Sequence, residues 1–236
     1  EKACDYGMVV TDEAGRVLSF QEKPKPEEAL SNLASTGIYI FEPEVLDLIP
    51  SDVEFDIGSQ LFPLLVEKGV PFFAQKRFFN WIDIGNVKDY WQVSQNVLKG
   101  ELAHMTMPGT QIADGVWVGL NTQIDWAGTT IEGPVYIGSG TTIEAGSKII
   151  GPTWIGHGSQ ICSGSEVTRS VLFEYTRVSP HSSMSELVVC KDYCVSREGK
   201  MQHVSECVED YWRDARDRRG KTRVPEVKQR KLAGVA

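Results

Sequence analysis

The feature that most constrains this sequence of 236 residues is a six-residue repeat between residues 112 and 172. An isoleucine or valine recurs at every sixth residue, with one extra residue between Ile124 and Ile131. No single six-residue unit can bury its own apolar face, so such repeats stack into a parallel coil. The positions in this register are Ile112, Val118, Ile124, Ile131, Ile137, Ile143, Ile149, Ile155, Ile161 and Val167.

Two further positions of the repeat follow the same period. The residue three positions after an anchor is often glycine or asparagine, which adopt a positive φ at little cost. The next residue is short or β-branched. We therefore predict a parallel β-helix whose aliphatic anchors point inward. The pattern loosens after Val167 and continues through Val178, Met184, Val189 and Val195. The predicted corner residues are Gly115, Asn121, Gly140, Gly146, Gly158 and Gly164.

The first hundred residues have a different pattern, in which short apolar runs alternate with amphipathic ones. Alternating strands and helices indicate α/β layering. The predicted elements are a strand–turn–strand unit over 6–25, strands over 33–41 and 72–84, and helices over 44–48, 57–68 and 87–99.

Four short motifs in this part occur in a recognisable order: Tyr6-Gly7, Glu22-Lys-Pro24, STGIYIF at 35–41 and WIDIG at 81–85. Together with the β-helix that follows, they resemble the rear half of a sugar-1-phosphate nucleotidyltransferase, or sugar-nucleotide pyrophosphorylase. The branches that make GDP-mannose and ADP-glucose share this domain order.

The resemblance implies a partial Rossmann-like α/β domain followed by a left-handed parallel β-helix of hexapeptide repeats. We expect three regions along the chain. They are the C-terminal half of the catalytic domain over 1–103, the β-helix over 104–200, and a capping helix with a basic tail over 201–236.

The resemblance also assigns roles to individual residues. Lys23 matches a lysine that binds the sugar phosphate, and Asp83 matches one of two aspartates that hold Mg²⁺. These two are the expected catalytic residues. The remaining expected contacts are to the sugar, from the Glu22 carboxylate, the backbone at Gly7, and the strand end at Thr36 and Gly37.

Each of the two catalytic assignments has a structural alternative. Asp83 precedes a glycine and a predicted helix, so it is also a candidate N-cap. Lys23 lies between Glu22 and Pro24, where a plain surface-loop charge would be unremarkable.

The reaction implied is attack of a sugar-1-phosphate oxygen on the α-phosphorus of a nucleoside triphosphate, with release of pyrophosphate. The first expectation for the product is GDP-mannose, followed by ADP-glucose or dTDP-glucose. The family's glycine-rich nucleotide loop and its other magnesium aspartate would lie upstream of Glu1. We therefore expect this chain to be a fragment or split half that supplies the sugar-phosphate side and is inactive alone.

Two other function classes remain open from the sequence. One is a non-catalytic regulatory or scaffold homologue of a pyrophosphorylase. The other is a hexapeptide-repeat acyltransferase that uses a histidine as its general base, for which His157 is the candidate and His181 is a weaker one.

Composition narrows the expected partners and compartment. The chain has a net charge of −8, and although residues 212–236 are basic, no recognition motif or stacking aromatic accompanies them, so nucleic acid is not expected. No apolar run approaches the roughly 20 residues of a membrane span. Five cysteines without a metal-type pair fit reduced thiols, so we expect a cytoplasmic protein. The open end of the coil favours homo-oligomers.

Overall fold

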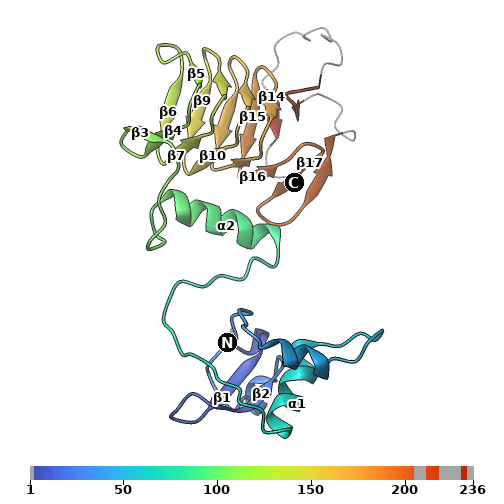
Figure 1. The fold of residues 1–236 in the computed structure, drawn as a ribbon. Coiled ribbons are helices and arrows are strands. Elements are labelled where there is room, and N and C mark those ends of the chain that lie inside the picture. Colours follow the sequence, from blue (N-terminus) through green and yellow to red (C-terminus); the bar gives the residue numbers. More distant parts are fainter. Residues whose placement is uncertain (1–2, 205–210, 218–229, 233–236) are drawn as a thin grey trace. The chain divides into compact units, whose positions relative to one another are not determined.

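The computed structural model describes residues 3–204, 211–217 and 230–232. The chain divides into two compact units, residues 1–81 and 82–236, each with its own hydrophobic core (Figure 1). The division falls between Trp81 and Ile82, upstream of the boundary at 103 expected from the sequence, so helix α2 (Val87–Leu98) belongs to the same unit as the repeat.

The first unit is built on an antiparallel hairpin of β1 (Met8–Thr11) and β2 (Val17–Gln21), as predicted. One face of the hairpin packs on a helical segment, because Phe20, Phe62 and Leu65 are all buried in one core. That segment begins as a π-turn, η4, and continues as an α-helix, α1. The helical elements of this unit are η1 (Ala3–Asp5), η2 (Pro26–Glu28), η3 (Pro43–Leu48), η4 (Ile57–Leu61) and α1 (Phe62–Glu67).

The two further strands predicted in this part are absent, and that prediction was wrong. In the segment 33–41 the only ladder contact is an isolated bridge between Ala34 and Met8, and in 72–84 it is a bridge between Phe73 and Arg16. Neither segment has a longer strand partner among the described residues. Phe41 and Phe72 still pack against the core of this unit, but other apolar side chains of the two segments are exposed, Ile40 to 98% and Phe78 to 92%.

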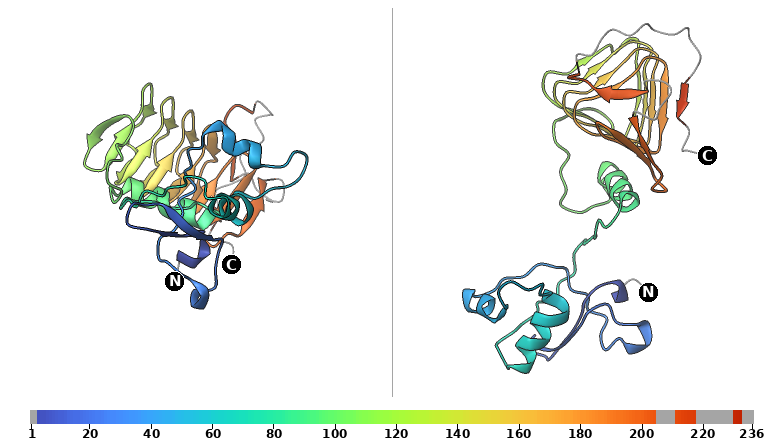
Figure 2. Two further views of the ribbon diagram at one scale, coloured as in Figure 1. Left: turned by 60° about the horizontal axis from the view of Figure 1, so that its bottom comes forward. Right: turned by 90° about the vertical axis from the view of Figure 1, so that its right-hand side faces the viewer.

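The second unit is a β-solenoid with three sheets, one for each side of the coil (Figures 1 and 2). The largest sheet runs, in spatial order, through β18 (Met201–His203), β17 (Tyr193–Ser196), β16 (Leu187–Val189), β13 (Val171–Leu172), β10 (Thr153–Ile155), β7 (Val135–Ile137), β4 (Val116–Val118) and β3 (Thr110–Ala113). The second runs through β19 (Trp212–Asp214), β14 (Thr176–Val178), β11 (Gln160–Ile161), β8 (Thr142–Ile143) and β5 (Gln123–Ile124). The third runs through β20 (Arg230–Leu232), β15 (Ser182–Ser185), β12 (Glu166–Thr168), β9 (Lys148–Ile150) and β6 (Thr130–Glu132).

Strand register confirms the six-residue reading of the sequence. Ile137 pairs in parallel with Ile155, and Ile143 with Ile161, in each case three hexads further along the chain. The anchors from Ile137 to Val167 are almost completely buried, as inward-pointing residues should be. All six predicted corner residues, from Gly115 to Gly164, adopt a positive φ.

The prediction fails at both ends of the repeat. Ile112 is 48% exposed, because β3 turns back antiparallel to β4 and leaves the coil. At the other end Cys194 is buried in the core and Val195 is only half-buried. The chain there runs antiparallel to β16, so the phase of the hexads no longer determines which side chain points inward.

The short residues after each corner have a polar role inside the coil. Their hydroxyl groups are buried and donate to backbone carbonyls: Ser159 to Gly156 at 2.8 Å, and Ser147 to Cys162 at 3.1 Å. A buried hydroxyl must find such an acceptor, because leaving it unpaired costs about 1–3 kcal/mol. The position is therefore occupied by a small hydroxyl residue that finds such an acceptor, or by valine, as at Val116, Val135 and Val171, which has no polar group to satisfy.

Helix α2 lies along the largest sheet, next to β10 and β16 (Figure 1). Leu98 is buried, the indole N–H of Trp91 donates to the carbonyl of Arg169 at 2.9 Å, and Tyr90 meets Phe173 edge-on. These contacts attach the helix to the solenoid.

The described part of the C-terminal region forms strands where a capping helix was expected over 201–236. β19 pairs antiparallel with β14, and its Trp212 is fully buried and donates its indole N–H to the carbonyl of Cys190 at 3.1 Å. The predicted packing of Tyr211 and Trp212 on the core is confirmed, whereas Val208 lies outside the described residues. Strand pairing wins here because β14 offers a free edge of the sheet.

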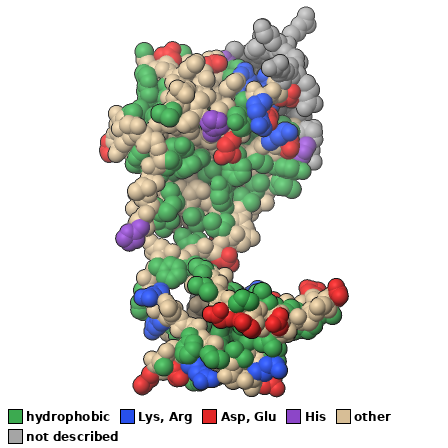
Figure 3. Space-filling model, in the orientation of Figure 1, with side chains coloured by type: hydrophobic (Ala, Val, Ile, Leu, Met, Phe, Trp, Pro, Cys, Tyr) green, Lys and Arg blue, Asp and Glu red, His purple; other side chains and the backbone are tan. Residues whose placement is uncertain are grey.

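Among the helices of the described residues, none combines the length and the apolar character that a bilayer crossing requires. Figure 3 shows hydrophobic side chains at the surface of both units, in keeping with the exposed apolar residues of each.

Candidate functional site

The side chain of Glu22 lies against two glycines in the first unit. Glu22 follows β2, Gly7 precedes β1, and the paired ends of these strands place the two residues together. A Cβ added at Gly7 would meet the Glu22 carboxylate at 3.0 Å, and one added at Gly58 would clash with the same oxygen, Oε2. Glu22 is exposed, and within the described residues its carboxylate has no hydrogen-bond or ion-pair partner. It is therefore available to an incoming ligand.

Lys23 continues the same loop in an uncommon backbone conformation. Its φ is +43°, in the left-handed region that residues other than glycine rarely occupy. The side chain is exposed and, among the described residues, makes no hydrogen bond or ion pair. Seven other described non-glycine residues also have a positive φ, several of them at solenoid corners, so this conformation fits both a functional lysine and an ordinary loop charge.

Thr36 and Gly37 lie near Gly7 because the preceding residue, Ser35, is hydrogen-bonded to it. The amide of Ser35 donates to the carbonyl of Gly7 at 2.7 Å, and the Ser35 hydroxyl is 3.0 Å from that of Tyr39. Gly37 has a φ of +74°. The first unit thus brings Gly7, Glu22, Lys23 and the 35–37 segment to one end of the β1–β2 hairpin.

Two residues near this cluster were not predicted from the sequence. Asp56 caps η4: its carboxylate accepts from the amide of Ser59 at 2.6 Å and from the Ser59 hydroxyl at 2.7 Å. These bonds lower the pKa of Asp56, and the positive charge of Lys23 lowers it further. Gly58 contacts Glu22, as described above. A signal was present, because Asp56-Ile-Gly58 repeats the tripeptide Asp83-Ile-Gly85; η4 begins within the first copy, and α2 begins shortly after the second.

Asp83 belongs to the second unit, just before α2. The sequence left open that it caps this helix, but the cap is Asn86, whose side chain accepts from the amide of Asp89 at 2.9 Å. Asp83 itself is exposed and, within the described residues, has no hydrogen-bond or ion-pair partner. Its carboxylate is of the oxygen type that Mg²⁺ prefers. However, no group of three or more potential ligand side chains meets in the part of the chain that the structure describes. Asp83 therefore fits as one ligand among several and forms no complete metal site.

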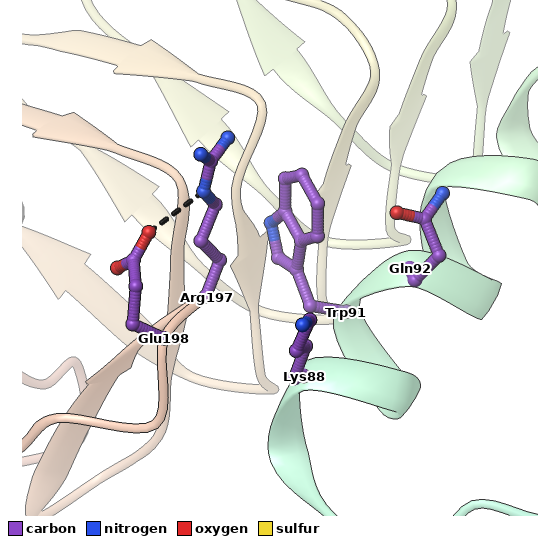
Figure 4. Close-up of a pocket in the computed structure, with 5 residues that line it drawn as sticks. All are labelled: Lys88, Trp91, Gln92, Arg197 and Glu198. Carbon is purple, nitrogen blue, oxygen red and sulfur yellow. Dashed lines mark hydrogen bonds and ion pairs between the residues drawn. The ribbon is translucent and has the colours of Figure 1, made fainter.

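The second unit also contains a cleft of about 370 Å³, between α2 and the turn that joins β17 to β18 (Figure 4). On the solenoid side of the cleft, Arg197 pairs with Glu198 at 2.7 Å and with Glu186 at 3.1 Å. On the helix side, Trp91 is one of the residues that attach α2 to the solenoid, through its bond to the carbonyl of Arg169. The cleft is lined by Lys88, Trp91, Gln92, Arg197 and Glu198.

His157, the candidate base of an acyltransferase, lies exposed next to a coil corner. Its ring meets that of Tyr175 edge-on, with centroids 5.2 Å apart. This contact gives the imidazole a packing role between successive coils.

Comparison with known proteins identifies the class. A family described as Nucleotidyl transferase matches residues 1–100. A UTP–glucose-1-phosphate uridylyltransferase of Synechocystis is 46% identical over 199 residues, which cover 84% of this chain and 51% of that protein. A glucose-1-phosphate adenylyltransferase of Desulfitobacterium hafniense is 35% identical over 107 residues, which cover 43% of this chain and 26% of that protein. One from Lachnospira eligens is 31% identical over 164 residues, covering 61% and 38%.

This chain belongs to the sugar-1-phosphate nucleotidyltransferase family, and it joins an α/β portion of that family to a β-solenoid. It spans about half the length of the first of these relatives and about a quarter of the second. The names of these relatives refer to glucose 1-phosphate, so they lend no support to the expectation of a mannose-1-phosphate guanylyltransferase.

Proposed function

We propose that this chain supplies the sugar-phosphate side of the active site in a nucleotidyltransferase that acts on glucose 1-phosphate. The observation that carries the proposal is the cluster of Gly7, Glu22, Lys23 and the 35–37 segment at one end of the hairpin. This cluster offers an exposed cation and an exposed carboxylate on consecutive residues, and neither makes a hydrogen bond or an ion pair within the described residues. A sugar phosphate presents the complementary groups, an anion and several hydroxyls.

In the proposed reaction, a phosphate oxygen of glucose 1-phosphate attacks the α-phosphorus of a nucleoside triphosphate. The bond from the α-phosphorus to the bridging oxygen breaks, and pyrophosphate leaves with that electron pair. Lys23 offsets the charge of the sugar phosphate and holds the attacking oxygen in line. Glu22 accepts hydrogen bonds from sugar hydroxyls, with the backbone at Gly7 and the Thr36–Gly37 turn beside the ring.

Magnesium is the proposed cofactor, with Asp83 as one of its ligands. When bound, the ion would supply positive charge that stabilises the negative charge of the reacting phosphate groups. Asp83 itself contributes an exposed carboxylate. This carboxylate does not cap α2, because Asn86 does so.

UTP is the proposed nucleotide, because the relative that shares 46% identity over most of this chain is described as a uridylyltransferase. ATP is the second candidate, from the adenylyltransferases.

Pyrophosphate release by the protein that carries this chain tests the proposal. UTP, ATP, GTP and dTTP are each combined with glucose 1-phosphate or mannose 1-phosphate, with and without Mg²⁺. We expect the highest kcat/KM for UTP with glucose 1-phosphate, and none after chelation of the metal. A preference for mannose 1-phosphate would overturn the assignment of glucose 1-phosphate as the substrate. If no combination releases pyrophosphate, the proposed function itself is wrong. Calorimetry of glucose 1-phosphate binding to the chain itself, with Lys23→Gln as control, isolates the sugar-phosphate side.

We also propose that the solenoid self-associates through its first coil. Strands β5 and β6 are the last in their sheets, so one edge of each is unpaired within the described residues. Leu120 is 76% exposed and Trp126 is 54% exposed at this end. Free strand edges and apolar side chains together favour pairing with a second copy. Light scattering should show a smaller particle for a Leu120→Lys, Trp126→Lys double variant and no change for Leu18→Lys in the first unit. An unchanged particle for the double variant would overturn this interface.

A further inference from the structure

Gly58 lies at the start of a helix without any backbone reason to be glycine. It is the second residue of η4, and its φ is not positive. An L-residue can adopt this conformation, and glycine inside a helix is less favourable than alanine by about 1 kcal/mol. The reason for a glycine must therefore lie in the space around it.

That space is filled by Glu22. A Cβ added at Gly58 would clash with Glu22 Oε2 and lie 3.1 Å from Glu22 Cδ, whereas the nearest atom of Phe20 would be at an ordinary 3.4 Å. From the other side, a Cβ added at Gly7 would lie 3.0 Å from the same Oε2. The two glycines, which are 51 positions apart in the chain, thus form the walls of a slot around one carboxylate.

The two walls differ in what else they contact. A Cβ at Gly7 would also clash with the ring of Phe20, which is buried in the core of the first unit. Gly7 therefore serves the packing of the core as well as the slot. At Gly58 the contacts that are too short are with the carboxylate group of Glu22, which is exposed to solvent, and Phe20 lies at an ordinary contact distance.

We propose that Gly58 is a positioning residue for sugar recognition: it leaves the room in which the Glu22 carboxylate is held to receive neighbouring hydroxyl groups of the hexose. The proposal rests on the function proposed above and adds a residue that acts through Glu22. A carboxylate confined between two walls loses little further freedom when a sugar binds, so its hydrogen bonds contribute more fully to affinity.

Kinetics of Gly58→Ala test the inference. The added methyl group pushes the carboxylate aside, and we expect KM for glucose 1-phosphate to rise about tenfold, the equivalent of one or two hydrogen bonds. KM for the nucleotide should stay unchanged, and the melting temperature should not fall, because alanine is the better helix former at this position. The matched glycine variant, Gly7→Ala, should lower the melting temperature as well, because its methyl group meets the Phe20 ring.

A second pair of variants tests whether the methyl group of Gly58→Ala acts through Glu22 or has a general effect on the protein. Glu22→Asp shortens the side chain by one methylene and withdraws it from Gly58. In a Glu22→Asp background, Gly58→Ala should therefore leave KM for the sugar phosphate unchanged. An equal, additive rise in both backgrounds would contradict the inference, as would a wild-type KM for Gly58→Ala alone.

A direct readout makes failure of the slot distinguishable from failure of the proposed function. The ¹³C resonance of the Glu22 carboxyl, assigned with Glu22→Gln, should shift in Gly58→Ala even if the protein turns over no sugar phosphate. A shifted resonance with no effect on sugar binding would support the contact between Gly58 and the Glu22 carboxylate but contradict its role in sugar recognition. An unshifted resonance would reject the slot itself.

Discussion

The two units of this chain bury their apolar residues in different ways. In the solenoid, Ile137, Ile155 and Ile161 are fully buried, each covered by equivalent residues of the coils before and after it. In the first unit, Ile40 and Phe78 are almost fully exposed, although each lies in a short run of apolar residues. In a repeat, the adjacent coils cover each apolar side chain. A strand of an α/β sheet, in contrast, is covered only if it pairs with strands from distant parts of the sequence.

A division of labour accompanies this contrast. The buried residues of the solenoid core are mostly aliphatic, with hydroxyl residues at the corners and Met184, Cys194 and Trp212 toward the C-terminal end, and they act on stability. The exposed, unpaired Glu22 and Lys23 lie in the first unit. Variants in the two units should therefore separate stability from turnover, and the predictions below test that separation from the largest expected effect to the smallest.

Removing a solenoid anchor should have the largest effect. Ile155→Ala deletes fully buried carbon atoms between β7 and β13, and we expect a loss of about 2–5 kcal/mol in the free energy of unfolding. Chemical denaturation followed by circular dichroism measures it. KM for glucose 1-phosphate should stay unchanged.

Ile112→Ala is the matched control, since Ile112 stands in the same sequence register but is 48% exposed. We expect it to cost less than about 1 kcal/mol. Equal losses for the two variants would contradict the burial that distinguishes them.

Neutralising Lys23 should lower activity and leave stability unchanged, the opposite of the effect of removing a solenoid anchor. Lys23→Gln removes the cation proposed to bind the sugar phosphate, and we expect kcat/KM to fall by about 100-fold, as for other charged hydrogen-bond donors to a reacting phosphate. The melting temperature should not change, because the side chain is exposed and makes no ion pair within the described residues.

Lys25→Gln controls for the loss of charge in the same loop. Lys25 is also exposed, and its nearest acid is Glu28 at 3.8 Å. A comparable loss of activity in Lys25→Gln would mean that the loop acts through its overall charge and that Lys23 has no specific place.

How much of the fold follows from the sequence depends on how local its determinants are. Corner glycines and inward anchors of the solenoid are set by the neighbouring hexads, and the six predicted corners all have a positive φ. Prediction failed at Ile112 and Val195, where the chain reverses direction and the period no longer applies. It failed again at 33–41 and 72–84, where a strand needs a distant partner that the periodicity cannot reveal.

The candidate site shows the same limit. Motif order pointed to Gly7, Glu22 and Lys23, and the structure brings these residues together. It did not point to Asp56 or Gly58, because their proximity to Lys23 and Glu22 arises from the packing of η4 beside β2. A short sequence motif identifies residues that share a function only if those residues are close together in the chain. The slot around Glu22 joins positions that are far apart.

The smallest predicted effect concerns an ion pair at the C-terminal edge of the solenoid, between the exposed Arg216 and the largely covered side chain of Asp214. Arg216 holds the Asp214 carboxylate with two hydrogen bonds, of 3.0 Å from Nε and 2.8 Å from Nη2, and lies over the Tyr175 ring. The Arg216 side chain lowers the pKa of Asp214 from 3.8 to about 2. Since Arg216 is well exposed, we expect the pair to contribute less than about 1 kcal/mol.

The direction of its pH dependence follows from the lowered pKa. The unfolded chain takes up a proton at Asp214 before the folded protein does, so the contribution is complete above about pH 4 and is lost as the pH falls through about 2. Melting temperatures of the wild type and Asp214→Asn should differ by a constant amount from pH 7 to 5 and converge between pH 4 and 2. Asp192→Asn, an exposed acid of the same unit, is the control. A difference that persists unchanged at pH 2 would show that Asp214 stabilises β19 through its shape and backbone contacts, and that its charge has no part in it.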